Sequence, residues 1–244
     1  MKNTFAIIGS GYILLRHLEA IRSIGGEITE VINENAFIDW ISLVNNTEAE
    51  YIIILTPNHL HETMAEYASR KGKIVLCEKP FDIKPTTKEY KNVFVVLQLR
   101  HHLLVKEMRK AIKQENKIEI NVEVWRNKSY DKGWKGDKAK SGGIYFNLGV
   151  HYIDLVQWLL KGRPAELIIN LSTKSKTPHR TITINGKKFD LSNKENLSEE
   201  NLHIKVYEDL IKGKGVQPKE LKKLTELCNQ LSLVREKLEP LYIK

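Results

Sequence analysis

The N-terminal part of this chain alternates short apolar runs with helical patterns, and this alternation is the feature that most constrains its fold. Phe5–Ile8 and Tyr51–Leu55 are continuous apolar runs of strand length, as in strands buried on both faces. The other expected strands are Glu27–Ile32, Lys73–Cys77 and Val93–Leu99. Helices are expected between them at 12–24, 37–44 and 58–70, with a short one capped by Thr86 or Thr87. Strands alternating with helices predict a parallel, doubly wound sheet.

The second part of the chain follows a different pattern. Ile118–Trp125 alternates apolar and polar residues, which predicts a strand with one face in water. Asn185-Gly186 is a strong signal for a tight hairpin. The other expected elements are helices at 103–115, 149–160, 198–212 and 218–238 and strands at 167–171, 181–184 and 187–191. This pattern predicts an α+β domain with a largely antiparallel open sheet.

The change of pattern near Leu99–Leu104 sets the expected domain boundary. A chain of 244 residues is long enough for two small domains with real cores. We therefore expect an α/β protein in which residues 1–100 form the parallel-sheet domain and residues 101–244 form the second domain.

Composition narrows the classes of partner. The net charge is +9, but lysines are spread along the whole chain without a dense basic stripe, which argues against a nucleic-acid partner. A composition bias explains the charge best, and attraction of phosphorylated small molecules comes second. No apolar run approaches the roughly 20 residues of a membrane span, so no membrane partner is expected. Cys77 and Cys228 match no zinc or redox spacing, which favours a reducing, cytoplasmic setting and no metal.

Gly9-Ser10-Gly11 lies between the first expected strand and its helix. Glycines there permit a sharp turn and let the backbone approach a pyrophosphate at the helix N-terminus. The full dinucleotide pattern has a third Gly or Ala where this chain has Leu14, so a glycine turn without a ligand remains an alternative. Asn33 and Glu34 end the second expected strand, where a ribose hydroxyl would be held. No arginine follows to receive a 2′-phosphate, which favours NAD over NADP.

Three further stretches carry a family resemblance: Thr56-Pro57-Asn58-His59-Leu60-His61, Glu78-Lys79-Pro80, and the run from Gly142 to Asp154. Together they resemble the glucose–fructose oxidoreductase/inositol dehydrogenase (Gfo/Idh/MocA) family. Finer marks are similar to the UDP-N-acetyl-2-amino-2-deoxyglucuronate 3-dehydrogenases of surface-polysaccharide synthesis. They include Gly11-Tyr12-Ile13 with Arg16-His17, and Leu97 through His102. The likeness covers nearly the whole chain.

The resemblance implies a Rossmann domain that binds NAD, a second domain whose open sheet often mediates oligomers, and catalysis by Lys79 and His151. A partly desolvated lysine beside a positive nicotinamide would give up its proton more readily. His151 would relay that proton or orient the hydroxyl; a helix N-terminus disfavours its imidazolium form. The wider family has Asp where this chain has Asn147, and the polysaccharide subfamily has Asn.

The remaining candidates fall into two groups. The cofactor is expected to contact Gly9, Gly11, Tyr12, Ile13, Asn33, Thr56, Pro57, Asn58, His61 and Glu78, with Glu78 on the nicotinamide ribose. Plain helix initiation is the alternative for Pro57 and Asn58. The substrate is expected to contact Arg100, Trp134, Lys135 and Asn147. Arg100 and Lys135 suit a carboxylate or phosphates, although either is equally well a surface charge, and Trp134 equally well a half-buried core residue.

The function implied is NAD-dependent oxidation of a ring hydroxyl, the 3-hydroxyl, of a UDP-linked N-acetylhexosaminuronate. The chain is several tens of residues shorter than typical members, and a helix and a strand of the nucleotide domain are expected to be missing. Two alternatives therefore stay open. One is a dehydrogenase for another sugar or a cyclitol; the other is a shortened, non-catalytic paralogue that binds NAD or a nucleotide sugar. A homo-oligomer through the C-terminal sheet is a further expectation.

Overall fold

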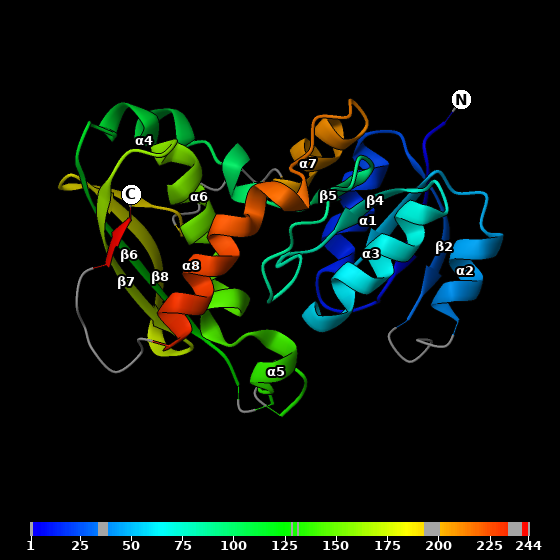
Figure 1. Cartoon of the computed structure of the whole chain (residues 1–244), viewed down its shortest axis with the longest axis horizontal. Helices are drawn as coiled ribbons and strands as arrows, with labels where there is room; N and C mark the ends of the chain where they lie inside the picture. Colours follow the sequence, from blue (N-terminus) through cyan, green and yellow to red (C-terminus); the bar gives the residue numbers. More distant parts are fainter. Residues whose placement is uncertain are drawn as a thin grey trace. The chain divides into compact units, whose positions relative to one another are not determined.

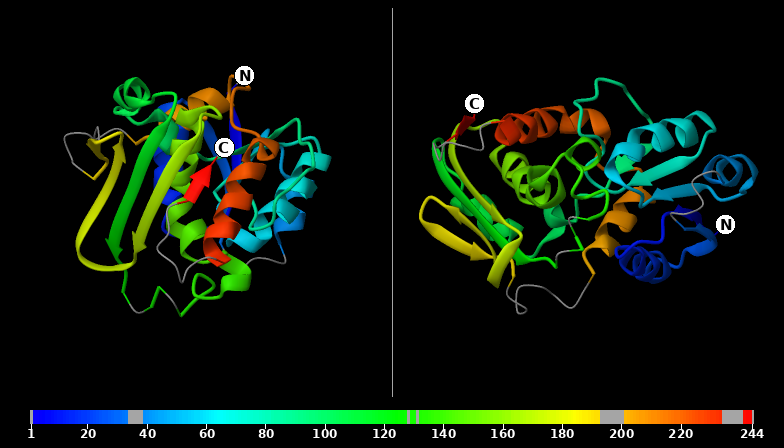
Figure 2. Two further views of the ribbon diagram at one scale, coloured as in Figure 1. Left: turned by 60° about the vertical axis from the view of Figure 1, so that its left-hand side comes forward. Right: turned by 90° about the horizontal axis from the view of Figure 1, so that it is seen from below.

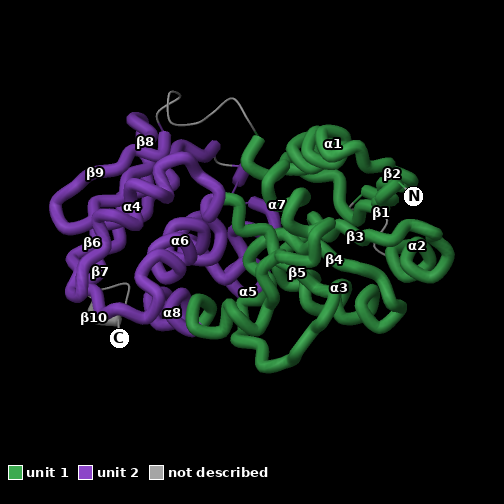
Figure 3. Tube along the Cα trace, turned by 90° about the horizontal axis from the view of Figure 1, so that it is seen from above, with its two compact units in different colours: residues 1–98, 201–225 green, residues 99–200, 226–244 purple. Residues whose placement is uncertain are grey.

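The computed structural model describes residues 2–33, 39–127, 129–130, 132–192, 201–233 and 241–243. The chain divides into two compact units (Figure 3). The N-terminal unit combines Met1–Gln98 with Asn201–Thr225, and the C-terminal unit combines Leu99–Glu200 with Glu226–Lys244. The sequence-based division assigns the segment 201–225 to the second domain, whereas the structure groups it with the first unit. The reason is that this segment packs against the sheet of the N-terminal unit.

The N-terminal unit is built on a five-stranded parallel sheet with the order β2-β1-β3-β4-β5 (Figure 1). Its strands are β1 (Thr4–Ile8), β2 (Glu27–Ile32), β3 (Tyr51–Ile54), β4 (Ile74–Cys77) and β5 (Val93–Val95). The parallel sheet expected from the alternating pattern is thus confirmed. The three central strands are almost wholly buried, as continuous apolar runs require.

Strand β2 lies at the edge of this sheet and is largely exposed. Among the described residues between β2 and β3, the chain forms a single helix, α2 (Trp40–Asn46). In the described residues β2 is therefore an edge strand, and the expected loss of a helix and a strand from the nucleotide domain stays a prediction. Residues 34–38, which include Glu34, lie outside the described part of the chain.

Helices cover this sheet and bring the distant segment 201–225 into the same core. They are α1 (Leu14–Ser23), α2, η2 (Asn58–Leu60), α3 (His61–Arg70), α7 (His203–Leu210) and η5 (Pro218–Leu221). Tyr207 of α7 is fully buried and packs edge-on against Phe5 of β1, with ring centroids 5.8 Å apart. Val216, beyond α7, forms an antiparallel bridge with Val95 of β5. Apolar burial thus ties this segment to the first unit.

The short helix expected after Thr86 or Thr87 is wrong, because residues 85–90 run without helical structure. The Thr86 hydroxyl donates to Glu62 of α3 at 2.9 Å, and the Tyr90 hydroxyl donates to the same carboxylate at 3.1 Å. These tertiary hydrogen bonds hold the segment along α3, and they replace the capping role that the sequence suggested.

The C-terminal unit contains a five-stranded mixed sheet with the order β10-β7-β6-β8-β9. Its strands are β6 (Asn116–Trp125), β7 (Ala165–Ser172), β8 (Lys174–Ile184), β9 (Lys187–Asp190) and β10 (Leu241–Ile243). Only the β6–β7 pair is parallel, which confirms a largely antiparallel sheet. One face of β6 is buried while Glu119, Asn121 and Glu123 remain half-exposed on the other, as the alternation predicts. Figure 2 shows α6 lying along this sheet.

The helices of this unit are η3 (Gln98–His101), α4 (Val105–Ala111), α5 (Lys138–Ser141), η4 (Tyr145–Gly149), α6 (Val150–Leu160) and most of α8 (Lys222–Leu233). Helix α4 ends earlier than expected because the Asn116 side chain accepts from the Lys113 amide and the chain turns into β6. The Asn185-Gly186 hairpin between β8 and β9 is confirmed, with positive φ at both residues. Within the described residues, no helix is long and apolar enough to cross a membrane.

Candidate cofactor and catalytic sites

The glycine turn after β1 has the geometry that a dinucleotide turn requires. Gly9 has φ +109°, and a Cβ there would lie 2.8 Å from the Leu55 backbone. Gly11 faces open space, and its carbonyl accepts from the Leu14 amide at the start of α1. Tyr12 is 98% exposed, and Ile13, at the N-cap, has no side chain able to cap the helix. The Leu14 and Arg16 amides of the first turn donate to the Gly11 and Ile13 carbonyls, so what the N-terminus of α1 provides for a pyrophosphate is its dipole and the open space at Gly11.

This geometry predicts that alanine at Gly9 lowers stability, whereas alanine at Gly11 lowers NADH affinity. Gly9→Ala should lower the free energy of unfolding by about 2–3 kcal/mol, because the residue is forced into a disfavoured φ against the Leu55 backbone. Gly11→Ala should leave stability unchanged but weaken NADH binding roughly tenfold, because its methyl group occupies the approach to the pyrophosphate. Urea unfolding and NADH fluorescence titration measure both. Equal NADH affinity of Gly11→Ala and the parent protein would contradict the assigned turn.

The carboxyl ends of the parallel strands bring several other predicted residues to one edge of the sheet. The backbone amides of Gly9, Leu55 and Glu78 donate to the last carbonyl oxygens of β2, β1 and β3, respectively. Asn33 follows β2 and is exposed. Ligands of open parallel sheets bind at this edge. Gly9, Asn33 and Glu78, which we predicted to contact the cofactor, therefore all follow the carboxyl ends of strands at this edge of the sheet.

His61 joins the two loops that follow β3 and β4. Its Nδ1 lies 2.7 Å from the carbonyl oxygen of Pro80, and its Nε2 lies 2.7 Å from that of Thr56. His61 and Asn58 are both buried. The His61 ring is thus occupied by the backbone on both sides and holds the Glu78-Lys79-Pro80 loop in place. Its predicted contact with the cofactor stays a prediction, and so do those of Thr56, Pro57 and Asn58.

Two buried histidines predict a loss of stability in mild acid. Burial lowers the pKa of His61 in the first unit and of His102 in the second below the ordinary 6.5. Protonation therefore favours the unfolded chain, so their contribution is complete above about pH 6.5 and is lost as the pH falls below it. Urea unfolding at about pH 7.5 and about pH 5.5 should show the lower stability in acid, with a smaller difference in His102→Gln. A stability that rises toward pH 5.5 would contradict this assignment.

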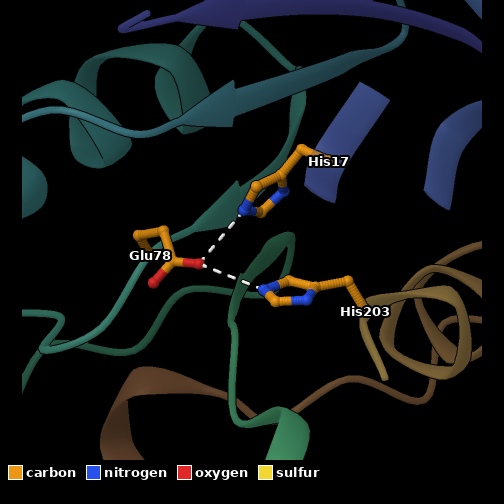
Figure 4. Close-up of side chains that lie close together, drawn as sticks. All are labelled: His17, Glu78 and His203. Carbon is orange, nitrogen blue, oxygen red and sulfur yellow. Dashed lines mark hydrogen bonds and ion pairs between the residues drawn. The ribbon is translucent and has the colours of Figure 1, made fainter. Parts of the chain in front are cut away.

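Glu78 belongs to a buried cluster that sequence reasoning missed. Its Oε1 lies 3.1 Å from Nε2 of His17 on α1 and 3.7 Å from Nε2 of His203 on α7 (Figure 4). Burial alone would raise the pKa of Glu78, but these two histidines hold it well below its usual value. Its Oε2 accepts from the Lys79 amide at 3.1 Å. The expected contact of Glu78 with a ribose is untested, and the structure shows its Oε1 facing inward to the two rings.

Lys79 follows β4 at the carboxyl edge of the sheet and is half-buried. Its backbone amide is held by Glu78, and the carbonyl of its neighbour Pro80 by His61. Both anchors are buried side chains, so the loop presents the Lys79 side chain from a constrained backbone. The role of Lys79 in proton transfer stays a prediction.

In the C-terminal unit, His151 lies in the first turn of α6, directly after the π-helical turn η4. Gly149 ends that turn, and a Cβ there would lie 2.8 Å from a methyl group of Leu171 on β7. A larger residue at this position would have to displace the Leu171 side chain, so glycine permits the close approach of η4 to the sheet. π-Helical turns are frequent at functional sites, and here one sets the position of the predicted catalytic histidine.

Three of the four predicted substrate residues lie together in this unit. The Lys135 ammonium lies 4.9 Å from the ring centroid of Tyr130 and 5.5 Å from that of Trp134. The Asn147 amide donates to the Lys135 carbonyl at 3.4 Å. Burial lowers the pKa of Lys135, and the nearby Arg126 adds to this effect. A half-buried cation beside aromatic rings is suited to a sugar that carries an anionic group.

Arg100, the fourth, is bound within its own unit. Its Nε and Nη2 donate to the two carboxylate oxygens of Asp154 on α6, at 2.9 and 2.6 Å. Its guanidinium also lies 5.5 Å from the ring centroid of Trp158. The Asp154 side chain is 4% exposed and that of Arg100 is 13% exposed. The structure thus gives Arg100 a clear structural role, and its contact with substrate stays a prediction.

Comparison with known families agrees with this architecture. Residues 3–106 match the family model described as "Oxidoreductase family, NAD-binding Rossmann fold". Residues 107–190 match the GFO/IDH/MocA C-terminal domain. Together the two models of one family match well over half of the chain.

Individual relatives carry several different activities. A 2,7-anhydro-N-acetylneuraminate hydratase of Mediterraneibacter gnavus is 24% identical over 190 residues, which are 67% of this chain and 50% of that protein. A 1,5-anhydro-D-fructose reductase of Ensifer adhaerens is 26% identical over 196 residues, which are 68% of this chain and 59% of that protein. This chain thus spans only about half the length of the curated relatives it matches.

A solved structure is similar across both units. It is the WlbA (WbpB) dehydrogenase from Thermus thermophilus, in complex with NAD and UDP-GlcNAcA, with a TM-score of 0.78 and 27% identity. The match covers 95% of this chain and 95% of that one. The chain therefore belongs to the GFO/IDH/MocA oxidoreductase family, and its N-terminal part is the NAD-binding Rossmann domain of that family.

Proposed function

We propose that this chain is an NAD-dependent dehydrogenase that oxidises a ring hydroxyl, the 3-hydroxyl, of a UDP-linked N-acetylhexosaminuronate in polysaccharide synthesis. The observation that carries the proposal is the likeness over 95% of both chains to a dehydrogenase solved with NAD and UDP-GlcNAcA. The retained Lys79, Asn147 and His151 support it, because a protein that only binds a nucleotide has no need of a proton-transferring pair.

The residues of the first unit fit NAD. The turn at Gly9 and Gly11 leads into an uncapped helix, and Gly11 leaves open space for a pyrophosphate. When bound, NAD⁺ supplies the hydride acceptor. Lys79 takes the hydroxyl proton at its Nζ, and hydrogen bonds to its backbone amide and to the Pro80 carbonyl fix the loop from which its side chain extends. His151 orients the hydroxyl or relays the proton, while Lys135 and Trp134 hold the anionic sugar.

A second enzymatic function keeps this chemistry and changes the substrate. The matched 1,5-anhydro-D-fructose reductase of Ensifer adhaerens acts on a sugar without a nucleotide. A relative of that kind favours a free sugar or cyclitol as the alternative. The internal deletion expected between Glu34 and Tyr51 favours a third function, a non-catalytic paralogue that binds NAD or a nucleotide sugar. Assembly of copies through the open sheet of the C-terminal unit also stays a prediction.

A panel of substrates separates these functions. The purified chain is incubated with NAD⁺ and either UDP-GlcNAcA, UDP-GlcNAc, free glucuronate or myo-inositol, and NADH formation is followed by absorbance. The proposal expects NADH with UDP-GlcNAcA and at least about tenfold less with UDP-GlcNAc, which lacks the carboxylate. Turnover of only a free sugar or cyclitol would replace the proposed substrate. Binding of NADH without turnover of any of them would favour the non-catalytic paralogue.

A further inference from the structure

His17, Glu78 and His203 come from three separate elements of the N-terminal unit and converge on one buried point. They belong to α1, to the loop after β4, and to α7, and their side chains are 0%, 11% and 7% exposed. One ligand atom from each lies within 4.8 Å of the others (Figure 4). Two imidazole nitrogens and one carboxylate oxygen make a donor set typical of zinc sites with three protein ligands.

The hydrogen bonds around His203 determine which of its nitrogens carries a proton. The Asn201 amide nitrogen donates to the Arg16 carbonyl at 2.6 Å and to the Glu19 carboxylate at 3.1 Å, so its Oδ1 is the acceptor. That oxygen lies 2.9 Å from His203 Nδ1, which must therefore carry the hydrogen. In the neutral ring, His203 Nε2 then has a lone pair directed at the Glu78 carboxylate.

A lone pair and a carboxylate oxygen that face one another are stabilised by a metal cation or by a proton between them. Among the described residues, His203 Nε2 has no hydrogen-bond partner, although it is buried. Its separation from Glu78 Oε1 is 3.7 Å, longer than the roughly 2.8 Å expected if a proton were shared between them. Ligands of one tetrahedral zinc ion, bound at about 2.0–2.2 Å, lie about 3.4 Å apart. Glu78 Oε1 lies 3.1 and 3.7 Å from the two Nε2 atoms, which brackets that value, and all three ligand atoms lie within 4.8 Å of one another.

The surroundings of both rings match the outer contacts of metal-bound histidines. His17 Nδ1 lies 2.8 Å from the Tyr207 hydroxyl, and His203 Nδ1 donates to Asn201. Such partners orient a ligating imidazole, and in both rings the Nε2 atom is directed to Glu78 Oε1. Tyr207 and Asn201 both come from the segment 201–225, so that segment supplies one ligand and supports a second.

We propose that His17, Glu78 and His203 bind a divalent cation of the zinc class, which links α7 to α1 and to the loop that carries Lys79. The site departs from the sequence-based expectation of no metal. The ion acts structurally: it joins the returning segment 201–225 to the Rossmann unit and holds Glu78, whose Oε2 accepts from the Lys79 amide.

Metal content of the protein without a histidine tag tests the site. Cells are grown with added zinc, and the purified protein is analysed by inductively coupled plasma mass spectrometry. The proposal expects about one zinc per chain. It also expects the visible absorption bands of four-coordinate cobalt after the protein is stripped by a chelator and titrated with Co²⁺. These two measurements use the unaltered chain, so they do not depend on the folding of any variant.

Matched substitutions locate the ion. His17→Gln and His203→Gln should each lower the zinc content at least about fivefold, whereas His102→Gln, which removes a buried histidine of the other unit, should retain it. Zinc below about 0.1 per chain with no cobalt bands, or zinc that persists in both cluster variants, would overturn the proposal. NADH titration of the same preparations is independent of this outcome, so a metal-free protein that binds NADH leaves the proposed dehydrogenase intact.

Discussion

Lys79→Met is expected to lower kcat for the oxidised sugar by at least about 100-fold, while the affinity for NADH stays within about twofold. Positioned proton transfer contributes roughly 10²–10⁴ to turnover, and methionine keeps the aliphatic length of lysine without a proton acceptor. The loop itself should persist, because it is anchored by the Lys79 backbone amide and the Pro80 carbonyl rather than by the lysine side chain. Steady-state kinetics and NADH fluorescence titration measure both quantities.

The matched control is Lys84→Met, five positions further along the same loop region. Lys84 is exposed, and its backbone amide donates to the Asp82 carboxylate at 3.0 Å. Its replacement removes the same charge and should leave kcat within about twofold. If Lys79→Met keeps more than about a tenth of the parent kcat, Lys79 does not carry the proton, and the assignment of the catalytic pair is contradicted.

Asp154→Ala should lower the free energy of unfolding by about 3–5 kcal/mol, the largest stability effect expected in the C-terminal unit. The substitution leaves the Arg100 guanidinium largely buried without the carboxylate that accepts both of its hydrogen bonds. Contact with the Trp158 ring compensates only a small part of that loss. Urea unfolding at neutral pH gives the difference directly.

Glu107→Ala is the control for removing a paired carboxylate at the surface. Glu107 also receives two hydrogen bonds, from Lys110 and Lys187, but its side chain is 47% exposed. Water replaces those contacts, so the change should be far smaller than that of Asp154→Ala. Equal effects of the two substitutions would show that burial does not determine the strength of the Arg100–Asp154 pair.

Local patterns predicted much of this fold because they report backbone preferences and burial directly. Continuous apolar runs identified the buried central strands, and Asn185-Gly186 identified a turn in which both residues have positive φ. Thr86 shows where local signals fail: its hydroxyl bonds to Glu62, a residue of another helix, and the expected capped helix does not form. Tertiary hydrogen bonds of this kind leave no trace in a local pattern.

The main feature that the sequence did not predict is the packing of a late segment of the chain into the first unit. Nothing in the pattern of α7 distinguishes a helix of the first unit from one of the second, yet Tyr207 packs in the first unit's core. The cluster of His17, Glu78 and His203 follows from that return, because its third member arrives 125 positions after the second. His17 and Glu78 were visible only as parts of family-like motifs, with no metal-ligand spacing between them.

The most direct test of the central claim, that this short chain is a working NAD-dependent dehydrogenase, starts from the protein as purified. The protein is denatured, any released nucleotide is identified by mass spectrometry, and the folded protein is then titrated with NADH. We expect NAD or NADH in the released material, or saturable binding of about one NADH per chain, lost or weakened in Gly11→Ala. A folded protein that releases no nucleotide and shows no saturable NADH binding would contradict it.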